Sequence, residues 1–344
     1  MKSVRIGKQT IRFLEKPVIL SSAAIVGPKE GRGPLAKGFD RIMENAENGQ
    51  NSYELAEHKM ILEACHKCLE KADVQPETVQ AFLGGDLLNQ IISTSLSARE
   101  MKIPFLGLYG ACSTMAESLL IGSILCDGGY AQPVLCTAGS HYCTAERQFR
   151  YPLEYGNQRT PAAQWTVTGA GACLLGNKHN GLACITHGTM GRVIDLGITD
   201  ANNMGAAMAP AAADTLSEFF CDTGKTAQDF DHIFTGDLGM IGSSLLKELM
   251  KQKGFDLPDD TYQDCGMLIF DEKDDIHAGA SGCGCSASVL SAHILPRLHS
   301  GEWKRVLFMA TGALMSTTSS QQGESIPGIA HAILLEHIRK EDHA

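Results

Sequence analysis

The sequence predicts an α/β fold made of two duplicated halves, with two mixed β-sheets and helices between and outside them. Three observations lead to this prediction. The chain has 344 residues, of which 44% are hydrophobic and 20% charged, a composition typical of a packed protein with room for two domains. The same series of patterns occurs twice along the chain, and short apolar runs alternate with segments of helical period.

Four patterns occur in the same order in both halves. They are an apolar run ending in Gly-Asp-Leu, a small-residue turn with cysteine before a helical pattern, a buried run leading into glycine, and a Gly/Ala-led strand. The paired stretches are 81–87 with 232–238, 110–119 with 282–290, 133–139 with 305–312, and 169–175 with 328–335. Each half therefore reads strand, helix, strand, helix, strand, strand, and we place the halves at 1–190 and 191–344.

The single elements follow from local patterns. Apolar residues recur at helical spacing in four segments, which are expected as helices: Tyr53–Ala72, Ser113–Leu125, Ser243–Lys251 and Ser286–Leu298. The apolar run Ile103–Tyr109 before a glycine turn predicts a buried strand. Two long segments, 142–164 and 196–226, lack clear periodicity, and we expect them to cap a site or to form a dimer contact.

Charge and hydropathy exclude several classes of protein. The net charge of −10 argues against binding to nucleic acid, which needs a basic face. No apolar stretch approaches the ~18 residues of a membrane span, and the first ten residues lack the apolar core of a signal peptide. We therefore expect an intracellular protein that meets a membrane only indirectly, through partners.

The twelve cysteines are expected to be reduced thiols, because no export signal precedes them. Cys65 and Cys68 have the spacing of a metal-binding pair. However, they lie in a segment of helical period, and no second pair follows. We expect no zinc and no other metal site built by the protein.

Cys112 is the residue with the clearest potential for chemistry. The sequence before it predicts a strand and a tight turn at Gly110-Ala111, and the sequence after it predicts a helix. A thiol at a helix N-terminus is favoured as thiolate, and this is how a nucleophile is presented for acyl transfer. A small residue buried in a crowded turn explains the same pattern equally well.

The duplicated halves and the motif Tyr109-Gly-Ala-Cys112-Ser-Thr resemble the thiolase-like superfamily, in which a cysteine in such a turn is acylated. The resemblance covers essentially the whole chain. It implies mixed five-stranded sheets layered with helices as α/β/α/β/α, and a homodimer paired through the sheet of the half with the cysteine. Condensing enzymes of this superfamily add two histidines, or a histidine and an asparagine. Here Gly236 and Cys283 stand at those positions, while His277 offers a substitute in a shortened motif.

A closer resemblance, to the stage V sporulation protein AD family of endospore-forming bacteria, runs the length of the chain. The stretches that carry it are 7–13, 81–90, 106–114, 147–156 and 278–285. It implies a binding protein, rather than an enzyme, for dipicolinic acid (pyridine-2,6-dicarboxylate) that takes part in its uptake into the developing spore. Its implied partners are the other stage V sporulation protein A channel subunits at the forespore or spore inner membrane. The alternative is an active acyltransferase that uses Cys112 with His277 or His141.

A site for this ligand needs a flat apolar or aromatic slot and donors for two carboxylates. Guanidinium groups suit carboxylates through bidentate pairing. Arg147, Arg150 and Arg159 fall in the segment 142–164, among several aromatic residues. We expect at least one of these arginines to reach the ligand.

The resemblance supplies further candidates, and the residues expected to bind the ligand are Asp86, Asn89, Cys112, His141, Arg150, Trp165 and His277. Because a carboxylate repels an anion, Asp86 would coordinate Ca²⁺ carried with the ligand, donate a hydrogen bond when protonated, or orient a neighbour. A purely structural role would be that Asp86 closes a turn at the end of a strand. Asp237 stands at the same place in the second half, which favours this structural role. No cofactor is expected apart from such calcium.

Overall fold

The computed structural model describes residues 4–149, 159–177, 180–271 and 273–338. Its strands are β1 (Thr10–Arg12), β2 (Val18–Val26), β3 (Arg41–Ile42), β4 (Ala81–Gly85), β5 (Phe105–Gly107), β6 (Val134–Ser140), β7 (Trp165–Thr166), β8 (Gly169–Gly176), β9 (Ala183–Thr189), β10 (His232–Thr235), β11 (Tyr262–Asp264), β12 (Ala280–Ser281), β13 (Arg305–Ala313) and β14 (Gly328–Glu336). Its α-helices are α1 (Tyr53–Ala72), α2 (Ile92–Met101), α3 (Thr114–Asp127), α4 (Tyr142–Phe149), α5 (Met204–Thr223), α6 (Gly239–Gln252), α7 (Cys283–Val289), α8 (Leu295–Ser300) and α9 (Thr317–Gln321).

Two sets of five strands have the same topology. The N-terminal set has the order β5-β4-β6-β8-β2 and the C-terminal set the order β11-β10-β13-β14-β9. In the first set β4 is parallel to β5 and β6, and β8 is antiparallel to β6 and β2. In the second, β10 is parallel to β11 and β13, and β14 is antiparallel to β13 and β9. The four repeated patterns thus occupy equivalent places, which confirms the internal duplication.

The two predicted mixed sheets are joined at one edge. The first residues of β2 pair with β9, Val18 with Cys184 and Ile19 with Ala183, so hydrogen bonding continues from one set into the other. The pairing satisfies backbone groups that two bare edges would otherwise leave open. In the C-terminal set β9 occupies the position that β2 occupies in the N-terminal set. The proposed domain boundary at residue 190 stays a prediction.

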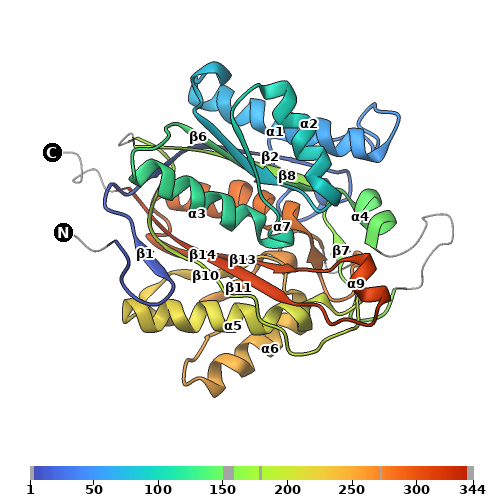
Figure 1. The fold of residues 1–344 in the computed structure, drawn as a ribbon, viewed down its shortest axis with the longest axis vertical. Coiled ribbons are helices and arrows are strands. Elements are labelled where there is room, and N and C mark those ends of the chain that lie inside the picture. Colours follow the sequence, from blue (N-terminus) through green and yellow to red (C-terminus); the bar gives the residue numbers. More distant parts are fainter. Residues whose placement is uncertain (1–3, 150–158, 178–179, 272, 339–344) are drawn as a thin grey trace.

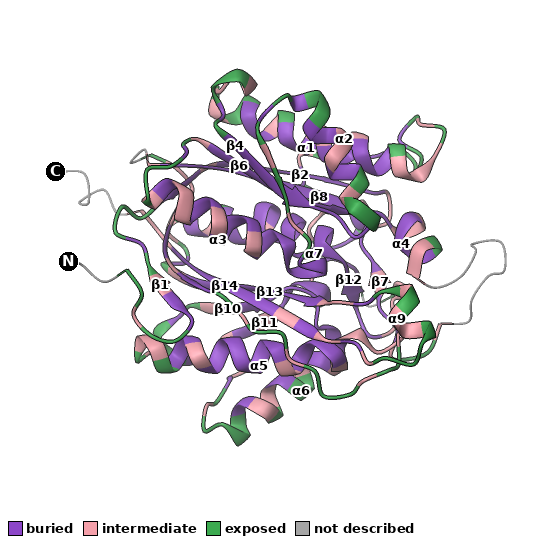
Figure 2. Ribbon diagram, viewed as in Figure 1, coloured by how far each residue is buried: buried purple, intermediate pink, exposed green. Residues whose placement is uncertain are grey.

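Helices and sheets alternate in five layers, as the predicted α/β/α/β/α arrangement requires. Helices α1 and α2 cover the outer face of the N-terminal set, and α5 and α6 cover the outer face of the C-terminal set (Figure 1). Helices α3 and α7 lie between the sets; in Figure 2 α7 is buried throughout, and α3 is mostly buried with some partly exposed residues. No helix in the described part of the chain is long and apolar enough to cross a membrane.

The predicted helices are present, with one interruption. Helix α1 has the predicted bounds, and α3 and α6 overlap their predicted segments. The fourth segment is divided into α7, a π-helical stretch over Leu290–Ile294, and α8. Pro296 explains the division, because its nitrogen has no hydrogen to donate within the helix.

Of the expectations about individual segments, the buried strand at 103–109 was wrong, and the two segments without clear periodicity both contain helices. The segment 196–226 contains the 20-residue helix α5, whose sides are nearly all buried, so that its apolar residues show no one-sided period. The segment 142–164 begins with helix α4. Strand β5 is an exposed edge strand rather than a buried one, and the side chain of Leu106 is 52% exposed.

Candidate functional site

Cys112 lies in a tight turn between the edge strand β5 and the central helix α3. Ala111, just before it, has a φ of 48°, an unusual backbone conformation for a residue with a side chain. Two hydroxyl groups close the turn: Ser113 donates to the carbonyl of Gly110 (2.7 Å), and Thr114 donates to the carbonyl of Ala111 (2.7 Å). The turn is therefore held rigidly, with Cys112 buried at the start of the helix.

Asp237 from the other half of the chain meets Cys112. It follows strand β10 and is fully buried; its carboxylate accepts hydrogen bonds from the backbone N–H of Gly282 (2.8 Å) and the hydroxyl of Thr311 (2.9 Å). The Cys112 thiol donates a third hydrogen bond to the same carboxylate. The two halves also approach closely here, because a Cβ on Gly312 would lie 2.2 Å from the carbonyl oxygen of Gly110.

These surroundings keep the Cys112 thiol protonated, contrary to the expectation of a thiolate at a helix N-terminus. Burial raises the pKa of Cys112 well above its usual range, and the negative charge of Asp237 raises it further. Burial also raises the pKa of Asp237 to about 6. Desolvation outweighs the helix dipole in this position, so the thiol is a poor nucleophile at neutral pH.

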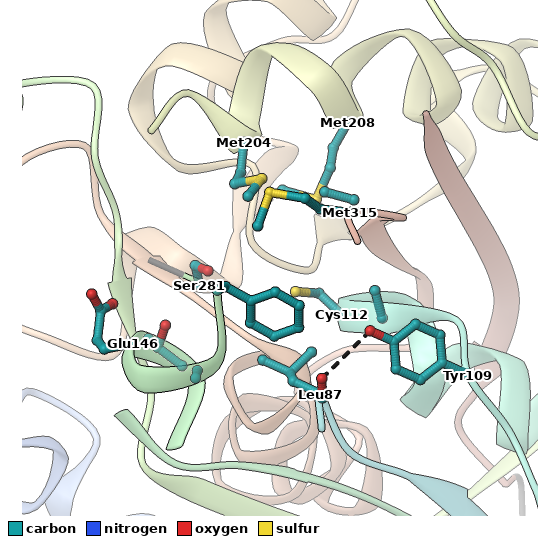
Figure 3. Close-up of a pocket in the computed structure, with 13 residues that line it drawn as sticks. Leu87, Tyr109, Cys112, Glu146, Met204, Met208, Ser281 and Met315 are labelled. Carbon is teal, nitrogen blue, oxygen red and sulfur yellow. Dashed lines mark hydrogen bonds between the residues drawn. The ribbon is translucent and has the colours of Figure 1, made fainter. Parts of the chain in front are cut away.

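A cavity opens above the Cys112 thiol. Both halves contribute to its walls, with Leu87, Tyr109 and Phe149 from the first and Met204, Met208 and Met315 from the second. It offers ≈ 60 Å³ to the centres of water-sized molecules, enough for a few waters. In Figure 3 the thioether groups of the three methionines gather on one wall, across from Cys112 and Tyr109.

The cavity wall is poor in charge. Glu146 is an acidic residue of the lining, and none of the described lining residues is a lysine, arginine or histidine. Hydroxyl groups come from Tyr109, which donates to the carbonyl of Leu87 (3.4 Å), and from Thr166 and Ser281. The cavity can therefore hold a small, largely apolar molecule, or one that brings a cation with it.

Asp86 is buried at the end of β4 and does not line this cavity. Its carboxylate accepts hydrogen bonds from the backbone N–H of Leu88 (2.9 Å) and from the N–H and hydroxyl of Thr94 (both 2.7 Å). Burial raises its pKa, and it lies near Cys283 much as Asp237 lies near Cys112. These contacts are those of a residue that closes a strand-end turn, and its role in binding stays a prediction.

His141 and Asn89 lie outside the cavity wall. The Nδ1 atom of His141 accepts from the backbone N–H of Cys143 at the start of α4 (3.1 Å), and its Nε2 bonds to the carbonyl of Ala46 (2.8 Å). Asn89 lines a separate surface depression together with Arg147. Arg147 forms an ion pair with Glu54 there.

Trp165, His277 and Arg159 come together next to the cavity rather than in it. The Trp165 ring stacks on Tyr142 with centroids 4.0 Å apart, and the guanidinium of Arg159 lies 4.9 Å from its centroid. Arg159 also donates to the carbonyl of Asp275 (2.9 Å). His277 contacts the carbonyl of Thr160 through Nδ1 (2.6 Å) and the carboxylate of Asp275 through Nε2 (2.7 Å).

Arg150, predicted to bind the ligand, lies outside the described residues. Cys65 and Cys68 lie on the buried face of α1, where burial raises the pKa of Cys68 to about 12. Within the described ranges no three or more His, Cys, Asp or Glu side chains are grouped so that they could hold a metal ion.

The sequence reasoning missed two parts of the site. Asp237 was seen only as the counterpart of Asp86, although the repeat itself placed it at a strand end facing the other half. The methionine wall was missed because Met204 and Met208 lie in the segment without helical period, and Met315 follows a strand in an irregular stretch.

A family model and a curated relative both identify the same protein family. The family model described as Stage V sporulation protein AD matches residues 7–336. Stage V sporulation protein AD of Bacillus subtilis (strain 168) is 45% identical over 331 residues, which cover 96% of this chain and 97% of the relative.

Solved structures agree on the fold. 3-oxoacyl-[acyl-carrier-protein] synthase III from Aquifex aeolicus VF5 is similar with a TM-score of 0.58 at 14% identity, over 93% of this chain and 99% of that one. Cerulenin-bound OleA from Xanthomonas campestris is similar with a TM-score of 0.61 at 13% identity, over 94% and 97%. At such identities the likeness concerns the fold alone, which is that of thiolase-like condensing enzymes.

Proposed function

The chain belongs to the stage V sporulation protein AD family, and from this premise we propose that it binds dipicolinic acid and takes part in its uptake into the developing spore. The observation that carries the proposal is the small cavity between the two halves, which opens on an unreactive thiol. The proposed partners are the other stage V sporulation protein A channel subunits. Through them the protein would act at the forespore or spore inner membrane, during uptake and again in germination.

The surroundings of Cys112 favour binding over catalysis. Acyl transfer needs a thiolate or a base beside the thiol, whereas burial and Asp237 hold the pKa of Cys112 high. His141 and His277, the two histidines considered as bases, each have both ring nitrogens engaged by other groups. Neither lines the cavity.

The shape and chemistry of the cavity suit a flat ring. Apolar side chains from both halves face one another across it, Leu87 and Phe149 from the first half and the three methionines from the second. Thioether sulfur makes favourable contacts with aromatic rings, and the flexible methionine side chain adapts to the outline of a ligand. We therefore propose that the pyridine ring lies between the methionine wall and the wall of Leu87 and Phe149.

The charge of the lining bears on the form of the ligand. Dipicolinate is a dianion, and Glu146 in the described lining would repel it. The calcium chelate brings its own cation, and carboxylate oxygen is a preferred ligand of calcium. We therefore propose that the chelate is the form bound, and that the carboxylate of Glu146, which points away from Cys112 in Figure 3, turns towards its metal when the chelate binds. Arg150 stays a further candidate for pairing with the ligand's carboxylates.

Calorimetric titration with dipicolinate, with calcium and with a chelator of calcium, tests this function. We expect saturable binding in the micromolar range, roughly −8 kcal/mol, that is tighter with calcium. Cys112→Phe should abolish binding by filling the floor of the cavity, whereas Cys221→Phe, at an exposed position, should not. Glu146→Gln should reduce the calcium dependence.

Two results would contradict the proposal. One is a flat titration under both conditions from protein with a normal melting curve. The other is a stable acyl group on Cys112 after incubation with acyl-CoA, detected by intact mass and peptide mapping. That second result would favour the alternative, an acyltransferase using Cys112.

We also propose a homodimer that forms through the exposed edge of β5. This three-residue strand ends the N-terminal set and leaves backbone groups open on its outer side. Exposed apolar side chains flank it, Leu106 on the strand, Tyr109 after it and Ile92 at the start of α2. An antiparallel pairing with the same strand of a second copy would cover this surface.

A further inference from the structure

The methionines of the cavity differ in how they are buried. Met204 is partly exposed and Met315 is 7% exposed, and both pack in a small cluster near the mouth of the cavity, together with Ala207 and Ile326. Met208 has no exposed surface and belongs to the larger core between α5 and the C-terminal strands. Two of the three thioethers can therefore be reached by a small molecule that enters the cavity.

We propose that Met204 and Met315 are a modification site at which a hydroperoxide oxidises the thioether and so closes the cavity to its ligand. This inference rests on the proposed binding function and adds its regulation. Hydrogen peroxide is small enough to enter a cavity that admits a few waters. One oxygen of the peroxide bonds to the sulfur, the O–O bond breaks, and the other oxygen leaves as water with both protons. The sulfur is oxidised by two electrons and the peroxide is reduced by two.

A sulfoxide on this wall would harm binding in two ways. Its oxygen takes up part of a small volume, and it turns an apolar contact surface into a strongly polar one. The polar oxygen would also need a donor. The hydroxyl of Tyr109 already donates to Leu87 and the thiol of Cys112 to Asp237, which leaves the hydroxyls of Thr166 and Ser281. When the ligand covers the wall, an oxygen that reaches neither of them is buried without a partner, which is costly.

The fold itself should survive this oxidation. The cluster around Met315 has a small buried centre, Ala207, Met315 and Ile326, and Met204 packs against both this cluster and the edge of the core of α5 and the C-terminal strands. Met208, which does support a main core, is shielded from solvent. The lesion is therefore confined to the cavity, and it is reversible, because reductases return methionine sulfoxide to methionine.

The chain offers matched controls elsewhere on its surface. Met240 and Met267 are 53% and 46% exposed and do not line the cavity. They should be oxidised first and without effect on binding. Leucine has nearly the volume of methionine and is not oxidised, so Met204→Leu/Met315→Leu is the test variant and Met240→Leu/Met267→Leu is its control.

The experiment exposes the full chain to graded hydrogen peroxide, followed by dithiothreitol to reverse reversible cysteine oxidation. Peptide mapping gives the extent of oxidation at each methionine, and calorimetry gives the affinity for dipicolinate with calcium. We expect wild type and the control variant to lose affinity, about tenfold or more, in proportion to oxidation at Met204 and Met315. The test variant, compared with its own untreated protein, should lose no affinity on oxidation, and methionine sulfoxide reductases of both stereospecificities should restore the wild type.

Three results would overturn the inference: full oxidation of Met240 and Met267 with none at Met204 and Met315, unchanged affinity after oxidation of the cavity pair, or equal loss in the test variant. If untreated protein does not bind dipicolinate, the proposed function fails, but the inference is still tested. The readout is then the rate at which methyl methanethiosulfonate modifies Cys112 through the cavity. Oxidation should change that rate in wild type and leave it unchanged in the test variant.

Discussion

Cys112 shows how far the chemistry of one residue depends on a neighbour that is distant in sequence. The helix N-terminus alone would favour the thiolate, yet burial and the carboxylate of Asp237 prevail. Asp237 also accepts from Gly282 and Thr311, so it joins the turn of Cys112 to two segments of the second half. A single carboxylate thus fixes the geometry of the site and suppresses the reactivity of its thiol.

Replacing this carboxylate should make the thiol more reactive. Asp237→Asn removes a negative charge beside Cys112 and lowers its pKa, and each unit of pKa is worth about tenfold in thiolate well below the pKa. We expect iodoacetamide to modify Cys112 at least about threefold faster in this variant at pH 8, measured by peptide mapping. Asp86→Asn is the matched control, because Asp86 lies beside Cys283 instead. Equal rates for wild type and Asp237→Asn would refute this explanation.

His331 on β14 makes stability depend on pH. Burial lowers its pKa to about 4, whereas the unfolded value is about 6.5. Between these values the unfolded chain binds a proton that the folded chain does not, so stability falls as pH falls from 6.5 towards 4. In His331→Gln the amide oxygen can accept from Gly191 N–H, as Nδ1 does now (3.1 Å).

Comparing the wild type with His331→Gln isolates the effect of protonating His331 on stability. From pH 7 to pH 5 the free energy of unfolding of the wild type should decrease relative to His331→Gln by about 2 kcal/mol. Urea unfolding at the two pH values measures this difference. If the two proteins change in parallel, His331 does not contribute to the pH dependence.

At the scale of elements, the short parallel pair β7 and β12 positions one wall of the cavity. Trp165 pairs with Ala280 and Thr166 with Ser281, and the second pair contributes both its residues to the lining. The Trp165 ring is held between Tyr142 and the ammonium group of Lys29, which lies 3.4 Å from the ring centroid. An aromatic ring outside the cavity thus supports the strand that forms its wall.

Removal of this ring should weaken binding without any loss of direct contact. Trp165→Leu is expected to reduce the affinity for dipicolinate about tenfold, because Thr166 and Ser281 lose their support. Trp303→Leu is the control: this ring is buried more deeply than that of Trp165, and it lies at the other end of β13 from the cavity. Calorimetry measures the affinity of both variants for dipicolinate, and thermal melting checks that the two variants are equally stable. An equal loss of affinity in both variants would contradict a positioning role for Trp165.

The elements that could be predicted were those with a distinct local signal. Glycine-terminated apolar runs marked β4, β6, β8 and their counterparts, and the spacing of apolar residues marked α1 to its ends. Helix α5 had no such signal because it is buried nearly all round. Sequence could place Cys112 in its turn, but the methionine wall and Asp237 reach it only through tertiary packing between the halves. Local pattern contains no information about such contacts.

The continuous sheet of the whole molecule ends in β11 and β5, and β5 is the more exposed of these two edge strands. If this edge forms the dimer, Leu106→Lys should place charge in the interface and give a monomer. Size-exclusion chromatography with light scattering gives the mass directly. Leu245→Lys, at a comparably exposed position on α6 in the other half, should leave the dimer intact. A wild type with the mass of a single chain would disprove the proposed assembly.

The place of β14 in the C-terminal set delays the completion of this set during protein synthesis. This strand lies between β13 and β9, but it is the last strand of the described chain, roughly two hundred residues after helix α3. At about 5–20 residues per second, the ribosome needs roughly 10–40 s to cover that distance. During this time helix α3, which packs against β13 and β14 as well as β6, has one apolar side without its cover. The nascent chain is thus a natural client for chaperones until its final strand leaves the ribosome.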